Sequence, residues 1–286
     1  MDYQIMMDVS GDILPEIAKQ NDLDFIPMDY SIGDEMRTCT GPEDAATIHA
    51  FYEGQRHGDL THTSQISPYM YEQHLKKYLE AGISVLYLCL SSGLSSTFQS
   101  ACTAREELKE KYPNADFFPV DTLAATGGMG VLAERAIRNR RAGMTIKENY
   151  EDLVKAASKI KHYFMVEDLM YLKRGGRVSA ATAVVGTALG IKPILIINKE
   201  GKLDNVNKKR GTKAACSCLV EEFKNGFADT GDVVYVIDAD DAEKGEHLAA
   251  EVKALFPHAV VRRSSLSPII GAHTGPGMAA ICFMGR

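Results

Sequence analysis

The stretch Val85-Leu-Tyr-Leu-Cys-Leu-Ser-Ser-Gly-Leu-Ser-Ser-Thr-Phe98 carries the clearest structural signal in the chain. Its first six residues lack polar alternation, which is typical of a strand covered on both faces in a parallel sheet. The Ser- and Gly-rich loop that follows leads directly into a helical pattern. In open α/β sheets, ligands bind beyond the carboxyl ends of strands, and a helix N-terminus offers free N–H groups and a positive dipole end. The stretch therefore predicts a buried central strand with an anion-binding loop at its end.

Short apolar runs alternate with helical patterns along the rest of the chain, which indicates strands joined by crossover helices around a mostly parallel sheet. The first half predicts strands at 3–7, 25–30, 85–90 and 117–120, and helices at 68–81, 96–112 and 124–142. After a charged helix at 146–161, strands are expected at 163–166, 193–198, 233–237, 259–262 and 279–283. We therefore expect an α/β protein of two closely packed domains, 1–160 and 161–286, with a ligand in the crevice between them.

Composition narrows the classes of partner. The chain has 286 residues, of which 45% are hydrophobic and 24% are charged, so a folded protein with a sizeable core is expected. A formal net charge of -6 gives no electrostatic basis for binding nucleic acid or an anionic membrane. No apolar run reaches the roughly 18 residues of a membrane span, and no signal peptide follows Met1. With six scattered cysteines, a reduced cytoplasmic protein without an integral membrane segment is expected.

Hydroxyl side chains gather at two predicted helix starts. The loop after the buried strand offers more of them than an N-cap needs, and the surplus is available to bind a ligand oxygen: Ser91, Ser92, Ser95, Ser96 and Thr97. Upstream, Ser67 before Pro68 is a good N-cap with proline at the first helical position. Ser67 is therefore assigned to capping. Thr63, Ser64 and Gln65 lie just before it, in a loop that can turn their donors toward the same crevice.

A single histidine, His273, lies in the glycine-rich segment Ile269-Ile-Gly-Ala-His-Thr-Gly-Pro-Gly277. Dense glycines are typical of a turn, and a lone histidine is often a surface group or a satisfied core group. The alternative is that the glycines let the backbone approach a ligand closely while the imidazole donates to a carboxylate. Both interpretations remain open on these residues alone.

Two short basic segments, Lys173-Arg-Gly-Gly-Arg177 and Lys208-Lys-Arg210, stand out in an acidic protein. They are typical of a solvated face, or they recognise a phosphate or an acidic partner surface. Between them, residues 178–197 are unusually apolar. One interpretation is a buried helix followed by a core strand. The other is a narrow apolar tunnel, with candidate lining residues Val184, Val185, Leu189, Ile194 and Ile196.

Sequence motifs for nucleotide, zinc and nucleophile sites are absent. The chain contains no G-x-x-x-x-G-K-[ST], G-x-G-x-x-G, H-E-x-x-H or G-x-S-x-G sequence, and its cysteines include no C-x-x-C pair. Glycines in a helical pattern often permit close packing, so Gly127-Gly-Met-Gly130 is not interpreted as a nucleotide motif. No cofactor and no metal are therefore expected.

Taken together, the motifs resemble those of the DegV family, which includes the fatty-acid-binding subunits (FakB) of bacterial fatty acid kinase. The resemblance spans essentially the whole chain and rests on six motifs in the family's order: Asp8-x-Ser10 with Asp12 and Leu14-Pro15, Thr63-Ser-Gln65, Ser91-Ser-Gly-Leu-Ser95, Leu172-Lys-Arg-Gly-Gly-Arg-Val-Ser179, Gly190-Ile-Lys-Pro193 and Gly271-Ala-His273. It implies a two-domain DegV-like fold that holds one long-chain fatty acid, with the acyl chain in an apolar tunnel and the carboxylate between the domains.

By the same resemblance, the carboxylate is bound by Thr63, Ser95 and His273, with Ser64 and Ser96 as neighbours. The resemblance also implies that the chain is not an enzyme. A separate ATP-dependent kinase subunit would phosphorylate the bound carboxylate, and the acyl phosphate would feed phospholipid synthesis. The basic positions associated with that partner or with the phosphate are Arg174, Arg177, Lys209 and Arg210.

The chain departs from the family pattern at Met7, Ile66 and Ser96, where Thr, Pro and Gly are usual. Two other functions remain open. An acyl-specific serine hydrolase would use Ser95 as nucleophile and His273 as base, but it needs a strained nucleophile turn and an orienting carboxylate. A lipid sensor without a kinase partner would share the binding site and omit the phosphorylation.

Overall fold

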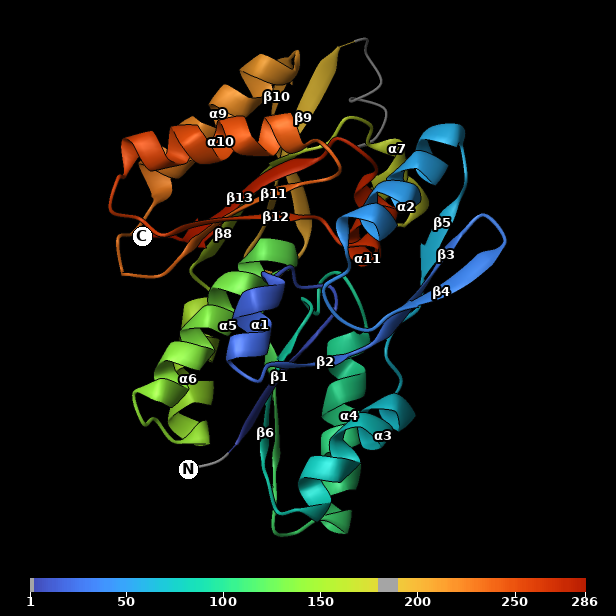
Figure 1. Cartoon of the computed structure of the whole chain (residues 1–286), viewed down its shortest axis with the longest axis vertical. Helices are drawn as coiled ribbons and strands as arrows, with labels where there is room; N and C mark the ends of the chain where they lie inside the picture. The colour runs from blue at the N-terminus through green and yellow to red at the C-terminus, as the bar shows by residue number, and fades with distance from the viewer. Residues whose placement is uncertain (1–2, 180–189) are drawn as a thin grey trace.

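The computed structural model describes residues 3–179 and 190–286, which form an α/β protein built on three sheets (Figure 1). The first sheet has four parallel strands in the order β2-β1-β6-β7. They comprise Gln4–Asp8 (β1), Asp24–Ile26 (β2), Val85–Cys89 (β6) and Phe117–Asp121 (β7). Strand β6 is a central strand with every residue buried, as its apolar run predicts. The chain order reverses between β1 and β6, and a ligand is expected at the carboxyl ends of these two strands.

The second sheet has six strands in the order β10-β9-β8-β13-β11-β12. They comprise Ile160–Met165 (β8), Ile191–Ile197 (β9), Leu203–Arg210 (β10), Val234–Asp238 (β11), Val261–Ser265 (β12) and Ala279–Met284 (β13). Strands β11 and β12 pair in parallel, and the other neighbours pair antiparallel. The expected α/β class, with a parallel sheet in the first half and a second α/β region, is confirmed. All six strands follow residue 159, although the division into domains at 160/161 stays a prediction.

A small third sheet, in the order β4-β3-β5, lies beside the other two. It comprises Met28–Ile32 (β3), Glu35–Cys39 (β4) and Thr61–Thr63 (β5), all paired antiparallel. Helix α11 (Pro268–Thr274), near the end of the chain, contacts β5, β3 and α2 (Ala45–His57), which come from its first quarter. The fold thus brings the segments with Thr63 and His273 together.

Helices cover both faces of each large sheet. Helices α3 (Pro68–Glu80) and α4 (Thr97–Lys111) contact the four-stranded sheet at β6 and β7, away from α5 (Thr126–Arg141) and α6 (Ile146–Ala157) (Figure 1). Helices α9 (Thr212–Gly226) and α10 (Ala242–Leu255) cover the outer face of the six-stranded sheet. Helix α5 also contacts β11 and β13, so it lies between the two large sheets. The other described helices are short: Pro15–Gln20 (α1) and Met170–Arg174 (α7).

The apolar core has two parts. One continuous cluster of buried side chains runs from Tyr3 to Met284 and joins the four-stranded sheet, α5 and the inner face of the six-stranded sheet. A second cluster fills the space between the six-stranded sheet and helices α9 and α10. Because the first cluster spans both halves of the chain, the halves pack closely, as the absence of a low-complexity linker in the sequence predicts.

The glycines of helix α5 permit this packing. A Cβ atom at Gly127 would lie 2.6 Å from the Cβ of Tyr235, and one at Gly128 would lie 1.9 Å from Nε2 of His162. A Cβ at Gly130 would lie 2.5 Å from the carbonyl oxygen of Asp12. The interpretation of this segment as a close-packing feature is therefore confirmed.

The six-stranded sheet is mainly antiparallel, whereas a mostly parallel sheet was expected along the chain. Three local predictions also differ from the structure. The single strand expected at 25–30 is two strands in different sheets, because Pro27 between them has no N–H to continue a ladder. The helix expected at 146–161 ends at Ala157, and its last expected residues form the start of β8. The glycine-rich segment around His273 is not all turn: its first part is helix α11, with Pro268 at the first helical position.

Candidate functional site

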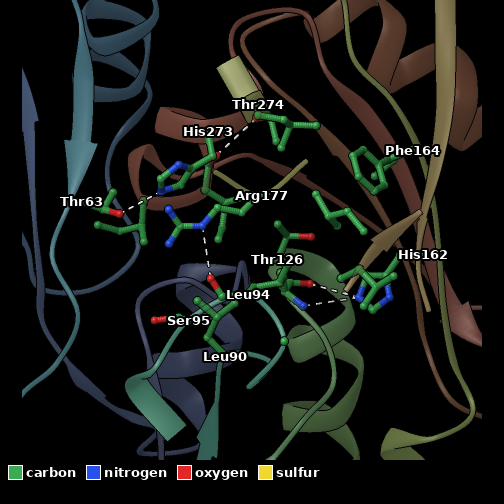
Figure 2. Close-up of a pocket in the computed structure, with 18 of the residues that line it drawn as sticks. Thr63, Leu90, Leu94, Ser95, Thr126, His162, Phe164, Arg177, His273 and Thr274 are labelled. Atoms are coloured by element: carbon green, nitrogen blue, oxygen red, sulfur yellow. Dashed lines mark hydrogen bonds between the residues drawn. The ribbon is translucent and has the colours of Figure 1, made fainter. Parts of the chain in front are cut away.

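A cavity of about 460 Å³ lies between the loops after β6 and β7 and the inner face of the six-stranded sheet (Figure 2). Strand β5 and helix α11 border it on the side where Thr63 and His273 lie. The place is the one expected from the reversal of strand order in the four-stranded sheet. Lining residues come from both sides of residue 160, so the cavity is built by both halves of the chain.

Some hydroxyls of the serine-rich loop after β6 stabilise the loop itself, and others line the cavity. Ser91 is fully buried, and its Oγ donates to the carbonyl of Gly201 at 2.7 Å and accepts from the N–H of Gly93 at 3.2 Å. Ser95 lines the cavity, and its Oγ accepts from the N–H of Thr97 at 3.2 Å and lies 2.9 Å from Oγ1 of Thr97. Ser92 and Ser96 also line the cavity. The loop therefore has more hydroxyls than capping uses, as predicted.

Thr63 and His273 form the opposite side of the same polar region. Oγ1 of Thr63 lies 2.9 Å from Nε2 of His273, although the two residues are 210 positions apart (Figure 2). Burial, together with the nearby charges of Arg177 and His62, lowers the pKa of His273 to about 4. The imidazole is therefore neutral at pH 7. Its Nδ1 has no hydrogen-bond partner in the described part of the chain.

Arg177 places a positive charge at this polar region. Its Nε donates to the carbonyl of Leu94 at 3.2 Å, and Nη1 donates to the carbonyl of Gly175. Within residues 3–179 and 190–286, no carboxylate forms an ion pair with it. Desolvation alone lowers the pKa of its guanidinium, which stays charged at neutral pH. The polar region therefore favours an anion.

Away from this polar region most lining side chains are apolar, although Thr126 and His162 also line the far end. It is lined by Leu90, Phe164, Leu172, Ile197, Leu203, Ile269, Met278 and Ala280. Donors and one cation at one side, with mainly apolar side chains over the remainder, match a ligand that has an anionic head and an apolar body.

Asp8 and Asp12, of the motif near the start of the chain, accept hydrogen bonds from the two segments that form the polar region. Asp8 is fully buried, and its Oδ2 accepts from the N–H of Leu90 at 2.8 Å, at the start of the serine-rich loop. Asp12 is also buried, and its Oδ1 accepts from the N–H of Ser267 at 3.0 Å, at the N-terminus of α11. Two acids, one at the end of β1 and one in the loop that follows, thus hold the segments that carry Ser95 and His273.

Only some of the other predicted contact residues line the cavity. Ser64, Ser96 and Arg177 line the cavity, and Gln65 does as well. Arg174 does not; its guanidinium lies over the ring of Tyr171, 4.5 Å from the centroid. Lys209 and Arg210 are on the edge strand β10, away from the cavity lining.

None of the predicted tunnel residues that the structure describes lines this cavity. Val184, Val185 and Leu189 lie outside the described residues. Ile194 is fully buried in the second core cluster, on the sheet face toward α9 and α10, and neither Ile194 nor Ile196 lines the cavity. Side chains alternate along a strand, so the cavity side of β9 is represented by Ile197 instead. Ile194 and Ile196 therefore lie on the face of the strand turned away from this cavity, and their assignment to an acyl tunnel stays a prediction.

Sequence reasoning also missed several lining residues, including Thr126, His162, Phe164 and Cys282. His162 and Phe164 alternate on β8, and each lies directly opposite an inward residue of β13. The alternation was visible in the sequence, but which face points to a ligand depends on strand pairing that no single segment encodes.

One group of three potential metal ligands occurs in the described ranges: His49, Glu53 and Asp240. The guanidinium of Arg56 already contacts Asp240 and lies 2.8 Å from Glu53, which disfavours a metal cation there. Among the helices that the structure describes, none is long and apolar enough to span a bilayer.

Comparison with known proteins gives consistent matches over the full length. A family model described as an uncharacterised protein of the DegV family matches residues 2–286. The chain is 36% identical over 290 residues to DegV domain-containing protein YteA of Lactococcus lactis, covering 100% of this chain and 99% of the relative. It is 34% identical over 284 residues to DegV domain-containing protein CPE0026 of Clostridium perfringens, covering 99% and 97%.

Solved structures agree with these matches. A DegV lipid-binding protein from Thermotoga maritima has a TM-score of 0.85 and 28% identity, covering 100% of this chain and 99% of that one. A second Thermotoga maritima protein, whose structure is described as revealing a fatty acid binding function, has a TM-score of 0.83 and 28% identity, with 100% coverage of both chains. The fatty acid kinase B3 protein of Streptococcus pneumoniae, loaded with linoleic acid, shares the fold at a TM-score of 0.86 and 20% identity, again with 100% coverage of both chains.

Proposed function

Because the chain belongs to the DegV family, we propose that it binds one long-chain fatty acid in this cavity and is not itself an enzyme. The observation that carries the proposal is the division of a single cavity into a polar region at one side and a mainly apolar remainder. Ser95, Thr63 and His273 lie at the polar region, beside the charge of Arg177, which pairs with no carboxylate of the described residues. Relatives of known structure that are described as lipid-binding or fatty-acid-binding support it.

The acyl chain supplies most of the binding free energy. Burying a chain of about sixteen carbons gains roughly 0.8 kcal/mol per methylene, or on the order of 12 kcal/mol before the costs of ordering. The carboxylate must lose water as it enters, and leaving it unpaired would cost several kcal/mol. The head group therefore needs donors, and the polar region provides them.

The hydrogen bonds within the site leave two hydroxyl protons for the ligand. When Nε2–H of His273 donates to Thr63, the Thr63 hydroxyl proton is available to a carboxylate oxygen. When the hydroxyl of Thr97 donates to Ser95, the Ser95 proton is available in the same way. His273 is neutral because its pKa is lowered, so only one of its ring nitrogens carries a proton. With that proton on Nε2, the ring donates to Thr63.

Arg177 attracts the carboxylate over a distance but does not form a bidentate ion pair with it. Its Nε and one Nη already donate to backbone carbonyls, so the geometry for a bidentate carboxylate pair is only partly free. This arrangement leaves lone pairs of a bound carboxylate available to react.

The second part of the proposal is presentation of the carboxylate to a kinase partner in the cytoplasm. One carboxylate oxygen would attack the γ-phosphorus of ATP held by the partner, forming a C–O–P link as the bond to the ADP oxygen breaks. Arg177 also lines a neighbouring groove of about 530 Å³, together with Lys202, through which a phosphate group would approach. The charge that develops there would be stabilised by the guanidinium.

Fatty-acid retention tests the binding site. The double variant Thr63→Ala/Ser95→Ala removes both hydroxyl donors, and it should lower the affinity for palmitate by about 1 to 3 kcal/mol for each lost buried partner. Equilibrium binding to delipidated protein would measure this. Thr38→Ala/Ser158→Ala makes the same chemical changes at exposed hydroxyls outside the cavity and serves as the control. Equal affinity in the two double variants would defeat the site assignment.

A serine hydrolase is the alternative that uses the same residues. In the described residues, Ser95 is hydrogen-bonded to Thr97 and not to His273, and no carboxylate accepts from His273. A catalytic triad is therefore not assembled. Labelling of Ser95 by a fluorophosphonate would favour the hydrolase, and its absence would favour the carrier.

A lipid sensor without a kinase partner shares the cavity and differs in the second step. Adding ATP and a purified fatty acid kinase subunit to the lipid-loaded protein separates the two. Acyl phosphate and ADP in equal amounts support presentation, whereas ligand that stays unphosphorylated points to the sensor.

A further inference from the structure

The inner face of the six-stranded sheet forms a trough along β13. The residues of this strand that face the cavity, Ala280 and Cys282, are small and buried. Ala280 lies directly opposite Phe164 of β8, and Cys282 lies directly opposite His162. Directly opposite residues project from the same face of an antiparallel pair, so two small side chains lie beside two large ones.

Helix α5 bounds the second side of the trough. Ile237 and Tyr235 of β11, opposite Ala280 and Cys282, are fully buried beneath Gly127 and Gly130 of α5 and do not line the cavity. The small side chains of β13 therefore lie between the bulky residues of β8 and the backbone of helix α5. A linear hydrocarbon chain fits such a trough better than a broad ligand does.

Helix α5 closes one end of the trough. Oγ1 of Thr126, the first residue of the helix, lies 3.9 Å from Sγ of Cys282. The ring of His162 packs directly against Gly128 of the same helix. Thr126 and His162 lie on the side of the cavity away from Thr63 and His273 (Figure 2). A ligand whose head is at the polar region would therefore end at this wall.

We infer that the trough over Ala280 holds the methyl end of the acyl chain and that side-chain volume at positions 280 and 282 sets the longest chain that fits. This inference rests on the proposed function, because it takes the head group to lie at Thr63, Ser95 and His273. Protein interiors are close-packed. Carbon atoms added to the side chains at positions 280 and 282 should therefore displace a similar number of carbons of the ligand.

Chain-length selectivity tests the inference. Delipidated protein is equilibrated with an equimolar mixture of saturated fatty acids of about ten to about twenty carbons, and the bound fraction is identified by mass spectrometry. Each methylene that no longer fits costs about fourfold in affinity. Ala280→Leu adds three carbons to the floor, so the preferred ligand should shorten by about two to three carbons, with a fall of roughly tenfold or more for the longest chains. Affinity for the shortest chains should stay as in the unsubstituted protein.

Cys282→Ala tests the same wall in the opposite direction. Removing Sγ at the closed end should extend the longest accepted chain by about one carbon. This substitution removes volume and cannot overpack the core. It therefore tests the inference even if Ala280→Leu does not fold.

The matched control lies on the same strand. Ala279 is buried in the second core cluster, on the sheet face turned away from the cavity. Ala279→Leu adds the same volume, and it should reduce stability while leaving the chain-length profile unchanged. A profile that stays the same in Cys282→Ala and Ala280→Leu, with normal binding by the unsubstituted protein, would overturn the inference alone. An unsubstituted protein that binds no fatty acid would overturn the proposed function instead.

Discussion

His162, at the closed end of the cavity, is buried as a neutral imidazole. Burial lowers its pKa from 6.5 to about 4, and its Nε2 lies 3.3 Å from the carbonyl oxygen of Ala125. The unfolded chain takes up a proton near pH 6.5, whereas the folded protein does so only near pH 4. The contribution of His162 to stability is therefore complete above pH 6.5 and is lost as the pH falls toward 4.

This difference predicts a pH-dependent effect of His162→Gln. At pH 5 the unsubstituted protein should lose about 2 kcal/mol of unfolding free energy relative to pH 7 that the variant does not lose. Urea unfolding of both proteins at the two pH values measures it. His57→Gln, the same substitution at an exposed position, is the control. An identical pH response of the unsubstituted protein and His162→Gln would show that His162 is not buried as a neutral group.

Comparing the two proteins is necessary because Asp12 acts in the opposite sense. Burial raises the pKa of Asp12 to about 7, so its proton stabilises the folded state at low pH, and that contribution is lost as the pH rises from about 4 toward 7. The Asp12 contribution is the same in the unsubstituted protein and in the His162 variant. It therefore cancels in their difference.

At the scale of single residues, the sequence predicted the polar part of the site better than its apolar part. Ser95, Thr63 and His273 stand in loops and caps, where hydroxyls and a lone histidine are informative. Apolar residues such as Ile194 carry no such signal, because a buried isoleucine is equally suited to a core or to a cavity wall. The face that each one occupies is decided by strand pairing.

Helix α5 is the element on which the cavity's geometry depends most. It lies between the two large sheets, and its glycines let it approach the six-stranded sheet closely. Its first residue, Thr126, lines the cavity next to Cys282. Moving this helix would therefore open or distort the closed end of the cavity.

Gly128→Ala tests this role. The added Cβ would lie 1.9 Å from Nε2 of His162, whose ring is fixed against the helix, so the helix must shift. The cost should be about 1 to 3 kcal/mol in unfolding free energy, typical of overpacking, measured by urea unfolding.

Gly226→Ala is the matched control for that substitution. Gly226 is also helical, in α9, and its added Cβ would meet its nearest neighbour, Phe283, at an ordinary 3.4 Å. A neutral result or a gain of up to about 1 kcal/mol is expected, because alanine favours a helix over glycine. Similar losses in both variants would contradict the close packing at Gly128.

Among the elements, the strongly patterned ones were predicted well. Strand β6 and helices α3 and α4 occur where the apolar periodicity and the Ser67 cap place them. The small sheet of β3, β4 and β5 was not predicted, because its short strands are partly polar and gain their stability from α2 and α11. Pro27, which separates β2 from β3, was the local signal available for that break.

The whole molecule makes one site from segments that are far apart in the sequence. Asp8 and Asp12 accept hydrogen bonds from the backbone N–H groups of Leu90 and Ser267, which fixes the serine-rich loop and helix α11, and the six-stranded sheet supplies most of the apolar lining. The α/β class and the position of the cavity followed from the sequence, since chain alternation and strand ends predict both. The antiparallel character of the larger sheet did not, because it depends on long-range pairing.

Mass spectrometry of lipid extracted from freshly purified, undenatured protein tests the central claim most directly. If the cavity binds an anionic head and an apolar chain as proposed, about one long-chain fatty acid should be recovered per protein chain, and delipidated protein should take up added palmitate to the same level. No recovered fatty acid, together with no uptake of palmitate at concentrations that saturate a micromolar site, would contradict the account.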